Sequence, residues 1–313
     1  MLNEVMIIGT GSVGSTIAYA MMIKGICREI YLVDRNRQKA RGEALDLSHG
    51  RAYVSPIEMK VGDYSDCSHV NVIVITAGAK QNPGETRIDL LNRNIGIMRS
   101  IIVSIEENRG DNEPILLIVS NPVDILTYFA YKFSTLPKTK VIGSGTALDT
   151  SRLRYEISNH CQIDARSIHG YIIGEHGDSE VALWSSLSIG NVLFDNFCEK
   201  CRKDCMGDVK KDIFEKVKNA AYFLIESKGY TNFGVGLATA RICEAIVKNQ
   251  HSVLPVSTIL DGEYGLSNLA ISLPCIIDSL GISRVLKTSM DEQEKEKFLV
   301  SAEKLRKVIG RLE

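Results

Sequence analysis

The amino-acid sequence predicts an α/β protein whose first half is a parallel β-sheet with helices on both faces. Helical stretches separate four short apolar runs, an alternation that is typical of parallel strands joined by crossover helices. The runs comprise residues 5–8, 30–33, 70–76 and 115–119. A chain of 313 residues, at about 150 residues per domain, also has room for a second domain.

The character of the sequence changes after a fifth apolar pair, Val141 and Ile142, where Gly-Ser-Gly occupies residues 143–145. Longer polar helices and less regular strands follow. We therefore expect a doubly wound parallel domain at 1–143 and an α+β domain at 144–313. The last helix is expected within 291–309, because apolar residues recur there at helical spacing: Phe298, Leu299, Ala302, Leu305 and Ile309.

The composition excludes several classes of protein. There are 37 basic and 38 acidic side chains, so the chain lacks the excess positive charge that binds a nucleic-acid backbone. The uncharged stretch 5–23 is rich in Gly, Ser and Thr and is preceded by Glu4, which argues against a membrane span or a signal peptide. We expect a cytoplasmic protein that binds neither nucleic acid nor membrane.

Eight cysteines at irregular spacing are typical of reduced thiols rather than of a disulfide framework. Only Cys198, Cys201 and Cys205 cluster. Three thiolates could begin a zinc site, but no fourth ligand lies close behind them. We therefore interpret the cluster as a solvated surface turn and predict no metal.

A glycine motif, Gly-Thr-Gly-Ser-Val-Gly at residues 9–14, follows the first apolar run and opens a helix. In the dinucleotide-binding (Rossmann) fingerprint the three glycines permit a tight turn, close approach of the backbone to a pyrophosphate, and close packing of helix on strand. Gly9, Gly11 and Gly14 hold these positions. Asp34 ends the second run 20 residues after Gly14, where a carboxylate binds a ribose 2′-hydroxyl.

These two features predict a Rossmann domain that uses NAD, because the negative charge of Asp34 would repel the 2′-phosphate of NADP. The structural alternative is that Asp34 only caps a turn.

Four further segments carry residues suited to catalysis, each with a simpler structural explanation. His176 lies in Gly-Glu-His-Gly-Asp at 174–178 and could be a surface histidine. Asp149 and Arg152 lie at an expected helix start, where they could form a helix cap with an ion pair. Asn121 follows the fourth run, at the edge of the sheet where ligands gather. A loop from Gly78 to Arg87 follows the third run and has glycines that would let it move.

Taken together and in this order, these segments resemble the L-lactate and malate dehydrogenase family over nearly the whole chain. The resemblance implies reversible hydride transfer between a nicotinamide cofactor and a small 2-keto acid. His176 would be the proton donor, Asp149 its orienting partner and Arg152 the clamp on the substrate carboxylate. Arg87 would move with the loop onto the keto oxygen. Asn121 and Thr231 would contact the substrate.

The resemblance also implies cofactor contacts beyond the fingerprint. They map to Val13, Lys39, Tyr64, Gly78, Ala79, Ser100, Asn121, Ser144 and Val235. In the malate branch of the family an arginine stands at the position of Gln81, where it meets the second carboxylate of oxaloacetate. The neutral Gln81, with Glu85 in the same loop, favours pyruvate and the lactate branch.

In bacterial members of the family the positions of Arg154 and His169 form a phosphate site between subunits, which fructose 1,6-bisphosphate occupies as an activator. The resemblance therefore implies this effector and a homotetramer. The chain begins almost on its first strand, which we interpret as the bacterial type. Two other functions stay open: the same reaction on oxaloacetate or a branched-chain keto acid, and a module that senses NADH without chemistry.

Overall fold

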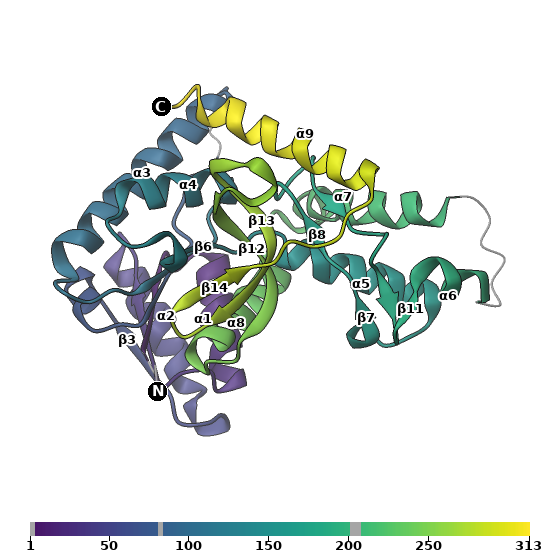
Figure 1. Ribbon diagram of the computed structural model, residues 1–313. Coiled ribbons are helices and arrows are strands. Elements are labelled where there is room, and N and C mark those ends of the chain that lie inside the picture. Colours follow the sequence, from purple (N-terminus) through teal and green to yellow (C-terminus); the bar gives the residue numbers. More distant parts are fainter. Residues whose placement is uncertain (1–3, 81–83, 201–207) are drawn as a thin grey trace.

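A nine-stranded sheet runs through the middle of the computed structural model, which describes residues 4–80, 84–200 and 208–313 (Figure 1). Six of its strands are parallel and lie in the order β3-β2-β1-β4-β5-β6. This is the doubly wound order, in which the sequence of strands reverses between β1 and β4. The bounds are β1 Glu4–Ile8, β2 Glu29–Val33, β3 Glu58–Val61, β4 Val72–Ile75, β5 Ile115–Ile118 and β6 Val141–Gly143. The predicted parallel α/β half is confirmed.

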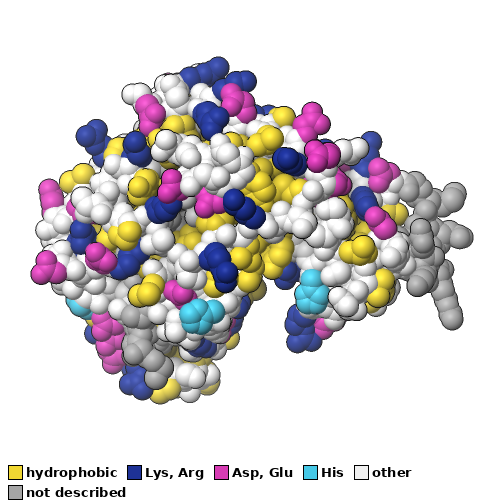
Figure 2. Space-filling model, viewed as in Figure 1, with side chains coloured by type: hydrophobic (Ala, Val, Ile, Leu, Met, Phe, Trp, Pro, Cys, Tyr) yellow, Lys and Arg dark blue, Asp and Glu magenta, His cyan; other side chains and the backbone are white. Residues whose placement is uncertain are grey.

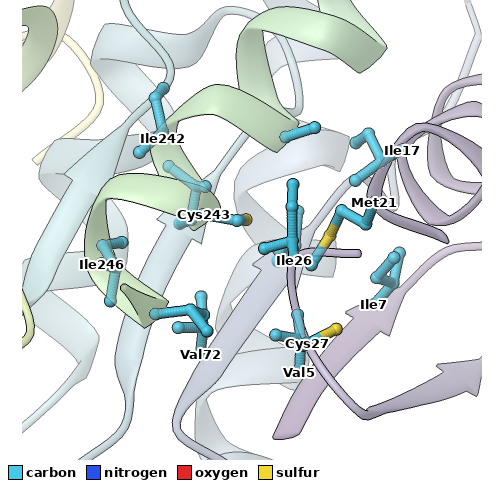
Figure 3. Close-up of a cluster of buried hydrophobic side chains, with 14 of the residues drawn as sticks. Val5, Ile7, Ile17, Met21, Ile26, Cys27, Val72, Ile242, Cys243 and Ile246 are labelled. Atoms are coloured by element: carbon cyan, nitrogen blue, oxygen red, sulfur yellow. The ribbon is translucent and has the colours of Figure 1, made fainter. Parts of the chain in front are cut away.

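Alternate residues of the central parallel strands are buried against different helices, because successive side chains of a strand point to opposite faces. In β1, Val5 and Ile7 belong to the apolar cluster that includes α1 and α8, shown in Figure 3. Met6 and Ile8 belong to the cluster that includes α3 and α4. Both faces of the sheet are therefore shielded from water at these strands, which explains why their sequences are continuous apolar runs.

The helices of this half are α1 Ser12–Lys24, α2 Arg37–His49, α3 Arg87–Asn108 and α4 Val123–Phe133, and α8 Phe233–Val247 from the second half packs against α1. Short 3-10 turns occupy η1 Arg51–Tyr53, η2 Tyr64–Ser68, η3 Lys138–Lys140, η4 Ala165–Ser167 and η5 Glu263–Gly265. Strand β3 was not predicted. It is an edge strand with an exposed Glu58, so its sequence lacks the apolar run that marks the central strands.

Three strands from the second half continue the same sheet: β12 Ser252–Asp261, β13 Ser267–Asp278 and β14 Gly281–Val285. Strand β12 joins antiparallel to β6, with Ser257 opposite Gly143. A Cβ atom at Gly143 would lie 2.3 Å from Thr127 Oγ1 and 2.7 Å from Ser257 Cβ, so only glycine allows this approach. Strands β12 and β13 form a long hairpin whose register shifts between Ile259 and Asp261.

The rest of the second half is a smaller α+β unit, seen at the right of Figure 1. Its helices are α5 Ala147–Cys161, α6 Phe194–Lys200 and α7 Val209–Lys228. Strands β7 Ile168–His169, β10 Ser188–Ile189 and β11 Val192–Leu193 form one small sheet, and β8 Ile172–Ile173 pairs with β9 Val181–Ala182. Leu153 and Ile157 of α5 pack with Ile213 and Val217 of α7 in its core.

The closing helix α9, Glu292–Ile309, begins with a capping box between Asp291 and Glu294. Phe298 and Ala302 are buried as predicted, with Leu305 and Ile309. Leu299 is 38% exposed, which corrects the prediction that it belongs to the apolar face. The polar Ser301 is fully buried on this face. Its hydroxyl accepts a hydrogen bond of 2.8 Å from the backbone N–H of Glu175, which compensates for the loss of contact with water.

Acidic and basic side chains are mixed over the face of the molecule in Figure 2, where hydrophobic side chains gather near the centre. Within the described residues, no helix combines the length and the apolar composition needed to cross a bilayer. Cys198 lies in α6, which corrects the prediction of a turn at that residue. Its side chain lies outside the described residues, as do Cys201 and Cys205, for which the surface turn stays a prediction.

The docking of α9 can be tested by two substitutions at adjacent residues. Phe298 is fully buried and meets the ring of Tyr264 edge-on, with centroids 5.2 Å apart. Phe298→Ala should lower the free energy of unfolding by about 3–5 kcal/mol, through lost burial and the remaining cavity. Leu299→Ala should change it by less than about 1 kcal/mol. Urea unfolding followed by fluorescence measures both, and equal losses would contradict the burial described.

Candidate active site

The glycine turn between β1 and α1 fits a dinucleotide. Gly9 has φ +104°, a conformation that favours glycine, and a Cβ there would lie 2.7 Å from Ala77 N. A Cβ at Gly14 would lie 1.9 Å from the Gly9 carbonyl oxygen, so helix and strand could not pack as closely. At Gly11 a Cβ would meet open space, and no side chain caps the start of α1 there. The glycine turn therefore leaves the backbone N–H groups at the start of α1 available to bind a pyrophosphate.

Asp34 lies at the end of β2, beside this turn. Its Oδ2 accepts hydrogen bonds from the Thr10 backbone N–H, at 2.8 Å, and from the Thr10 hydroxyl, at 3.1 Å. Its Oδ1 accepts from the Asn36 N–H at 3.0 Å. Burial alone would raise the pKa of Asp34, but these hydrogen bonds outweigh it and lower the pKa. Asp34 thus does cap a turn, and it is also an ionised acceptor at the edge where a ribose would lie.

The other predicted cofactor positions are spread along the same edge and beyond it. Val13 and Val235 are partly buried against the cluster of α1 and α8, and Tyr64 against that of α3 and α4. The Lys39 ammonium acts on the charge of Asp34. The Ser144 N–H follows β6 and donates to the Ile118 carbonyl. The Ser100 hydroxyl donates to the Gly96 carbonyl within α3, so its geometry adds no support for a cofactor contact.

Asn94 of α3 connects the two loops that follow β4 and β5. It is 5% exposed; its Oδ1 accepts from the Ala79 N–H at 2.8 Å, and its Nδ2 donates to the Asn121 carbonyl at 3.4 Å. It therefore fixes the backbone beside Gly78, Ala79 and Asn121. The sequence analysis missed Asn94, although a polar residue on the apolar face of a helix was a usable signal.

The loop after β4 is shorter than predicted. Helix α3 begins at Arg87 itself, because Thr86 and Asp89 form a capping box. Arg87 is exposed and faces α7, where its charge acts on Tyr222. The Arg93 guanidinium donates to the Lys80 carbonyl, at 2.7 Å, and to the Glu85 carboxylate, at 2.8 Å. Gln81 lies outside the described residues.

Two predicted catalytic residues, Asp149 and His176, meet the predicted substrate-binding Arg152 in the second half of the chain. The Asp149 side chain is 2% exposed and lies in the first turn of α5. Its Oδ2 lies 2.5 Å from His176 Nδ1, and its Oδ1 accepts from Arg152 Nη1 at 2.9 Å. The ion pair with Arg152 that the structural alternative required is present, but the cap position belongs to Thr146. His176 is not a plain surface residue, since its side chain is only 24% exposed.

Asp124, at the start of α4, links His176 to the main sheet. Its Oδ2 accepts from the His176 backbone N–H at 2.7 Å, and its Oδ1 from the Ser257 hydroxyl of β12 at 2.6 Å. The sequence analysis gave Asp124 no role. Its position close behind Asn121 brings His176 to the edge of the sheet where the glycine turn and Asp34 also lie.

Carboxylates control the charge of His176. Burial lowers its pKa, but the charge and the hydrogen bond of Asp149 raise it, with help from Asp124 and Glu180, to about 9. The reverse holds at Asp149: burial would raise its pKa, but His176 and Arg152 lower it. The site therefore holds an imidazolium at neutral pH, beside a guanidinium. Such a pair can bind a carboxylate and protonate a neighbouring oxygen.

The remaining predicted residues surround this group less closely. Thr231 is partly buried just before α8. Arg154, on α5, donates from Nη2 to the Gly170 carbonyl at 3.2 Å and lies over the Tyr171 ring. His169 is exposed in β7, next to Gly170 in the chain, so Arg154 and His169 lie near one another. Residues that sequence reasoning gave no role, but that build the site, are Thr10, Asn94, Asp124 and Glu180.

This arrangement defines a class of protein: a Rossmann-fold protein with a protonated histidine and an arginine at the edge where a dinucleotide fits. Two family models cover it, the lactate/malate dehydrogenase NAD binding domain at residues 3–143 and the lactate/malate dehydrogenase alpha/beta C-terminal domain at 146–313. The chain belongs to the lactate/malate dehydrogenase family, and the prediction of NAD as cofactor is confirmed.

Known proteins that are similar to this chain match it over nearly its full length. The chain is 49% identical over 312 residues to an L-lactate dehydrogenase of Thermoanaerobacter sp. (strain X514), covering 100% of both. It is 48% identical over 304 residues to one of Clostridium perfringens (strain SM101 / Type A), covering 97% of this chain and 95% of that one. A solved structure of the minor L-lactate dehydrogenase from Enterococcus mundtii, in a ligands-bound form, has a TM-score of 0.95 at 42% identity, covering 99% and 98%.

The control of His176 by Asp149 can be measured directly. In Asp149→Asn the negative charge is lost while burial persists, and only the weaker contributions of Asp124 and Glu180 remain, so the pKa of His176 should fall from about 9 towards its ordinary value of 6.5. NMR of ¹⁵N-histidine-labelled protein across a pH series reports this pKa. Asp178→Asn, at an exposed carboxylate of the same segment, is the control and should leave it near 9. A value near 9 in both variants would contradict the assignment.

Proposed function

We propose that the chain is an NAD-dependent L-lactate dehydrogenase, which reduces pyruvate to L-lactate with NADH and runs the reaction in reverse. The observation that carries this is the buried Asp149, paired at once with the His176 imidazole and the Arg152 guanidinium. The names of the similar proteins support the same activity. In fermentation this reaction would regenerate NAD.

In this mechanism each residue has one task. Arg152 clamps the substrate carboxylate with its planar guanidinium. Because His176 Nδ1 is bound to Asp149, its Nε2 is the atom that delivers the proton to the keto oxygen. Arg87 stabilises the negative charge that develops on that oxygen, a contribution that is largest when water is excluded. NADH, when bound, supplies the hydride.

Other residues position the reactants in this proposal. Asn121 contacts the keto oxygen side and the cofactor, and Thr231 and Gln81 line the substrate pocket. Gln81 is neutral, so the pocket favours the methyl group of pyruvate over the second carboxylate of oxaloacetate. Gly9, Gly11, Gly14 and Asp34 hold the cofactor. In this proposal residues 1–143 form the NAD-binding domain and 144–313 the substrate domain, and Gln81, Arg87 and Asn121 reach the substrate from the first of them. We also propose a homotetramer in the cytoplasm.

A panel of 2-keto acids tests this activity. With NADH, the parent should reduce pyruvate with a higher kcat/KM than oxaloacetate or a branched-chain acid, and the product should be L-lactate. Arg152→Lys loses the bidentate pairing and should raise the KM for pyruvate by about tenfold to a hundredfold, with NADH binding unchanged. Arg166→Lys, at a 90% exposed side chain, is the matched control.

Preference for oxaloacetate would move the chain to the malate branch. Tight NADH binding without turnover of any keto acid would instead favour the NADH-sensing module. Either result would overturn the proposed activity.

Regulation by fructose 1,6-bisphosphate is proposed from Arg154 and His169. Both are close in the chain to the catalytic segments: Arg154 follows Arg152 on α5, and His169 precedes β8 and the segment of His176. Binding between subunits would therefore act on the site through short, packed connections. Titration of the bisphosphate at subsaturating pyruvate should lower the half-saturating pyruvate concentration. No change in the parent, or the same change in Arg154→Gln, would reject this effector site.

A further inference from the structure

Glu180 is a buried carboxyl group beside the catalytic histidine to which the mechanism above gives no task. It is 7% exposed and lies at the end of a tight turn, in which its N–H donates to the Gly177 carbonyl at 3.2 Å. Its Oε1 is buried and, within the described part of the chain, has no hydrogen-bond partner. An ionised carboxylate left unpaired in such a place is costly, whereas a protonated one is not.

Charged groups face Glu180 from three elements. On α5, Asp149 opposes its ionisation and Arg152 favours it; in the catalytic segment, His176 favours it; on α7, Lys218 favours it. Asp124, from α4, acts on His176 rather than on Glu180 directly. The site thus has two firm cations, His176 and Arg152, and the carboxylate of Asp149 already neutralises one of them.

A keto acid brings one more negative charge to these cations. An ionised Glu180 would add a buried negative charge that repels the incoming carboxylate, and its binding would be opposed. A protonated Glu180 removes this repulsion and leaves His176 and Arg152 to attract the substrate. Substrate binding and protonation of Glu180 must then favour one another, since linkage is reciprocal.

We propose, on the basis of the proposed function, that Glu180 is a positioning residue that must carry a proton for the keto acid to bind, in addition to the proton held by His176. At alkaline pH it takes up this proton from solvent when the keto acid binds. Glu180 contacts neither reactant in this proposal. When protonated it carries no charge, so that the positive charges of Arg152 and His176 can interact with the substrate.

The direction of the pH effect follows from both groups. Burial, then the charge of Asp149, raises the pKa of Glu180 to about 8, and the pKa of His176 is about 9. In this proposal the substrate binds only to protein in which both Glu180 and His176 are protonated. The affinity for substrate therefore falls as pH rises through about 8, and it falls more steeply above about 9. Beyond both values the loss should approach about a hundredfold per pH unit, against about tenfold for a single group.

Calorimetry measures the protons directly. Oxamate, a pyruvate isostere that cannot accept hydride, is titrated into the protein with saturating NADH at pH 7, 8 and 9, in buffers of different ionisation enthalpy. At pH 9 the parent should take up more than one proton per oxamate bound, which a single group cannot do. Glu180→Gln, which is neutral at every pH, should take up at most one at each pH.

Two further variants separate the role of Glu180 from a structural effect. Glu180→Asp restores a titratable group and should again exceed one proton. Glu226→Gln, at an exposed carboxylate of α7, should match the parent. The kcat/KM profile for pyruvate gives a second readout: above pH 9 the slope should be close to two in the parent and close to one in Glu180→Gln.

The outcomes are distinguishable. Binding of oxamate by the parent with no more than one proton at any pH would overturn the role of Glu180 and leave the proposed function intact. So would an uptake above one that persists in Glu180→Gln. Absence of oxamate binding in the parent would overturn both proposals. If Glu180→Gln does not fold, the uptake by the parent and by Glu180→Asp still decides.

Discussion

The buried carboxylate of Asp149 is the interaction on which the candidate site depends. An ionised group that is 2% exposed is stable only if its charge is compensated, and here two cations share it. Each cation is thereby oriented: the imidazole through Nδ1, the guanidinium through one nitrogen. The same contact that stabilises Asp149 therefore fixes the orientation of the His176 ring, with Nε2 turned away from Asp149, and the direction of Arg152.

The surrounding fold holds α5 and the His176 segment in register for that contact. The Thr146 hydroxyl donates to the Ile172 carbonyl at 2.6 Å, and the Thr150 hydroxyl accepts from the Ile172 N–H at 2.9 Å. Both threonines are buried at the start of α5. Strand β8 leads into the segment of His176. These two hydrogen bonds therefore fix the position of α5, and with it Asp149, relative to the histidine.

Two further contacts join this group to the rest of the molecule. Asp124 binds the His176 backbone to α4 and, through Ser257, to β12 of the main sheet. Ser301 of α9 binds the preceding residue, Glu175. The segment of His176 is thus supported by α4 and β12 through Asp124 and by α9 through Ser301. The buried carboxylates of Asp149 and Asp124, which hold His176 in place, also raise its pKa. The same two groups therefore position the histidine and increase its affinity for a proton.

The sequence by itself determined the parallel half of the fold, because its central strands are dry on both faces and read as apolar runs. It also predicted the glycine turn, which needs glycines at fixed spacing, and it indicated the candidate catalytic group through the resemblance of several segments to one family. It missed β3, whose exposed edge carries charged residues, and it misplaced Leu299, one residue away from the buried face of α9. Only the tertiary structure decided that β12 pairs with β6, that Asn94 joins two loops, and that Asp124 and Glu180 lie around His176. These contacts connect residues far apart in the chain, and their register depends on packing rather than on any local pattern.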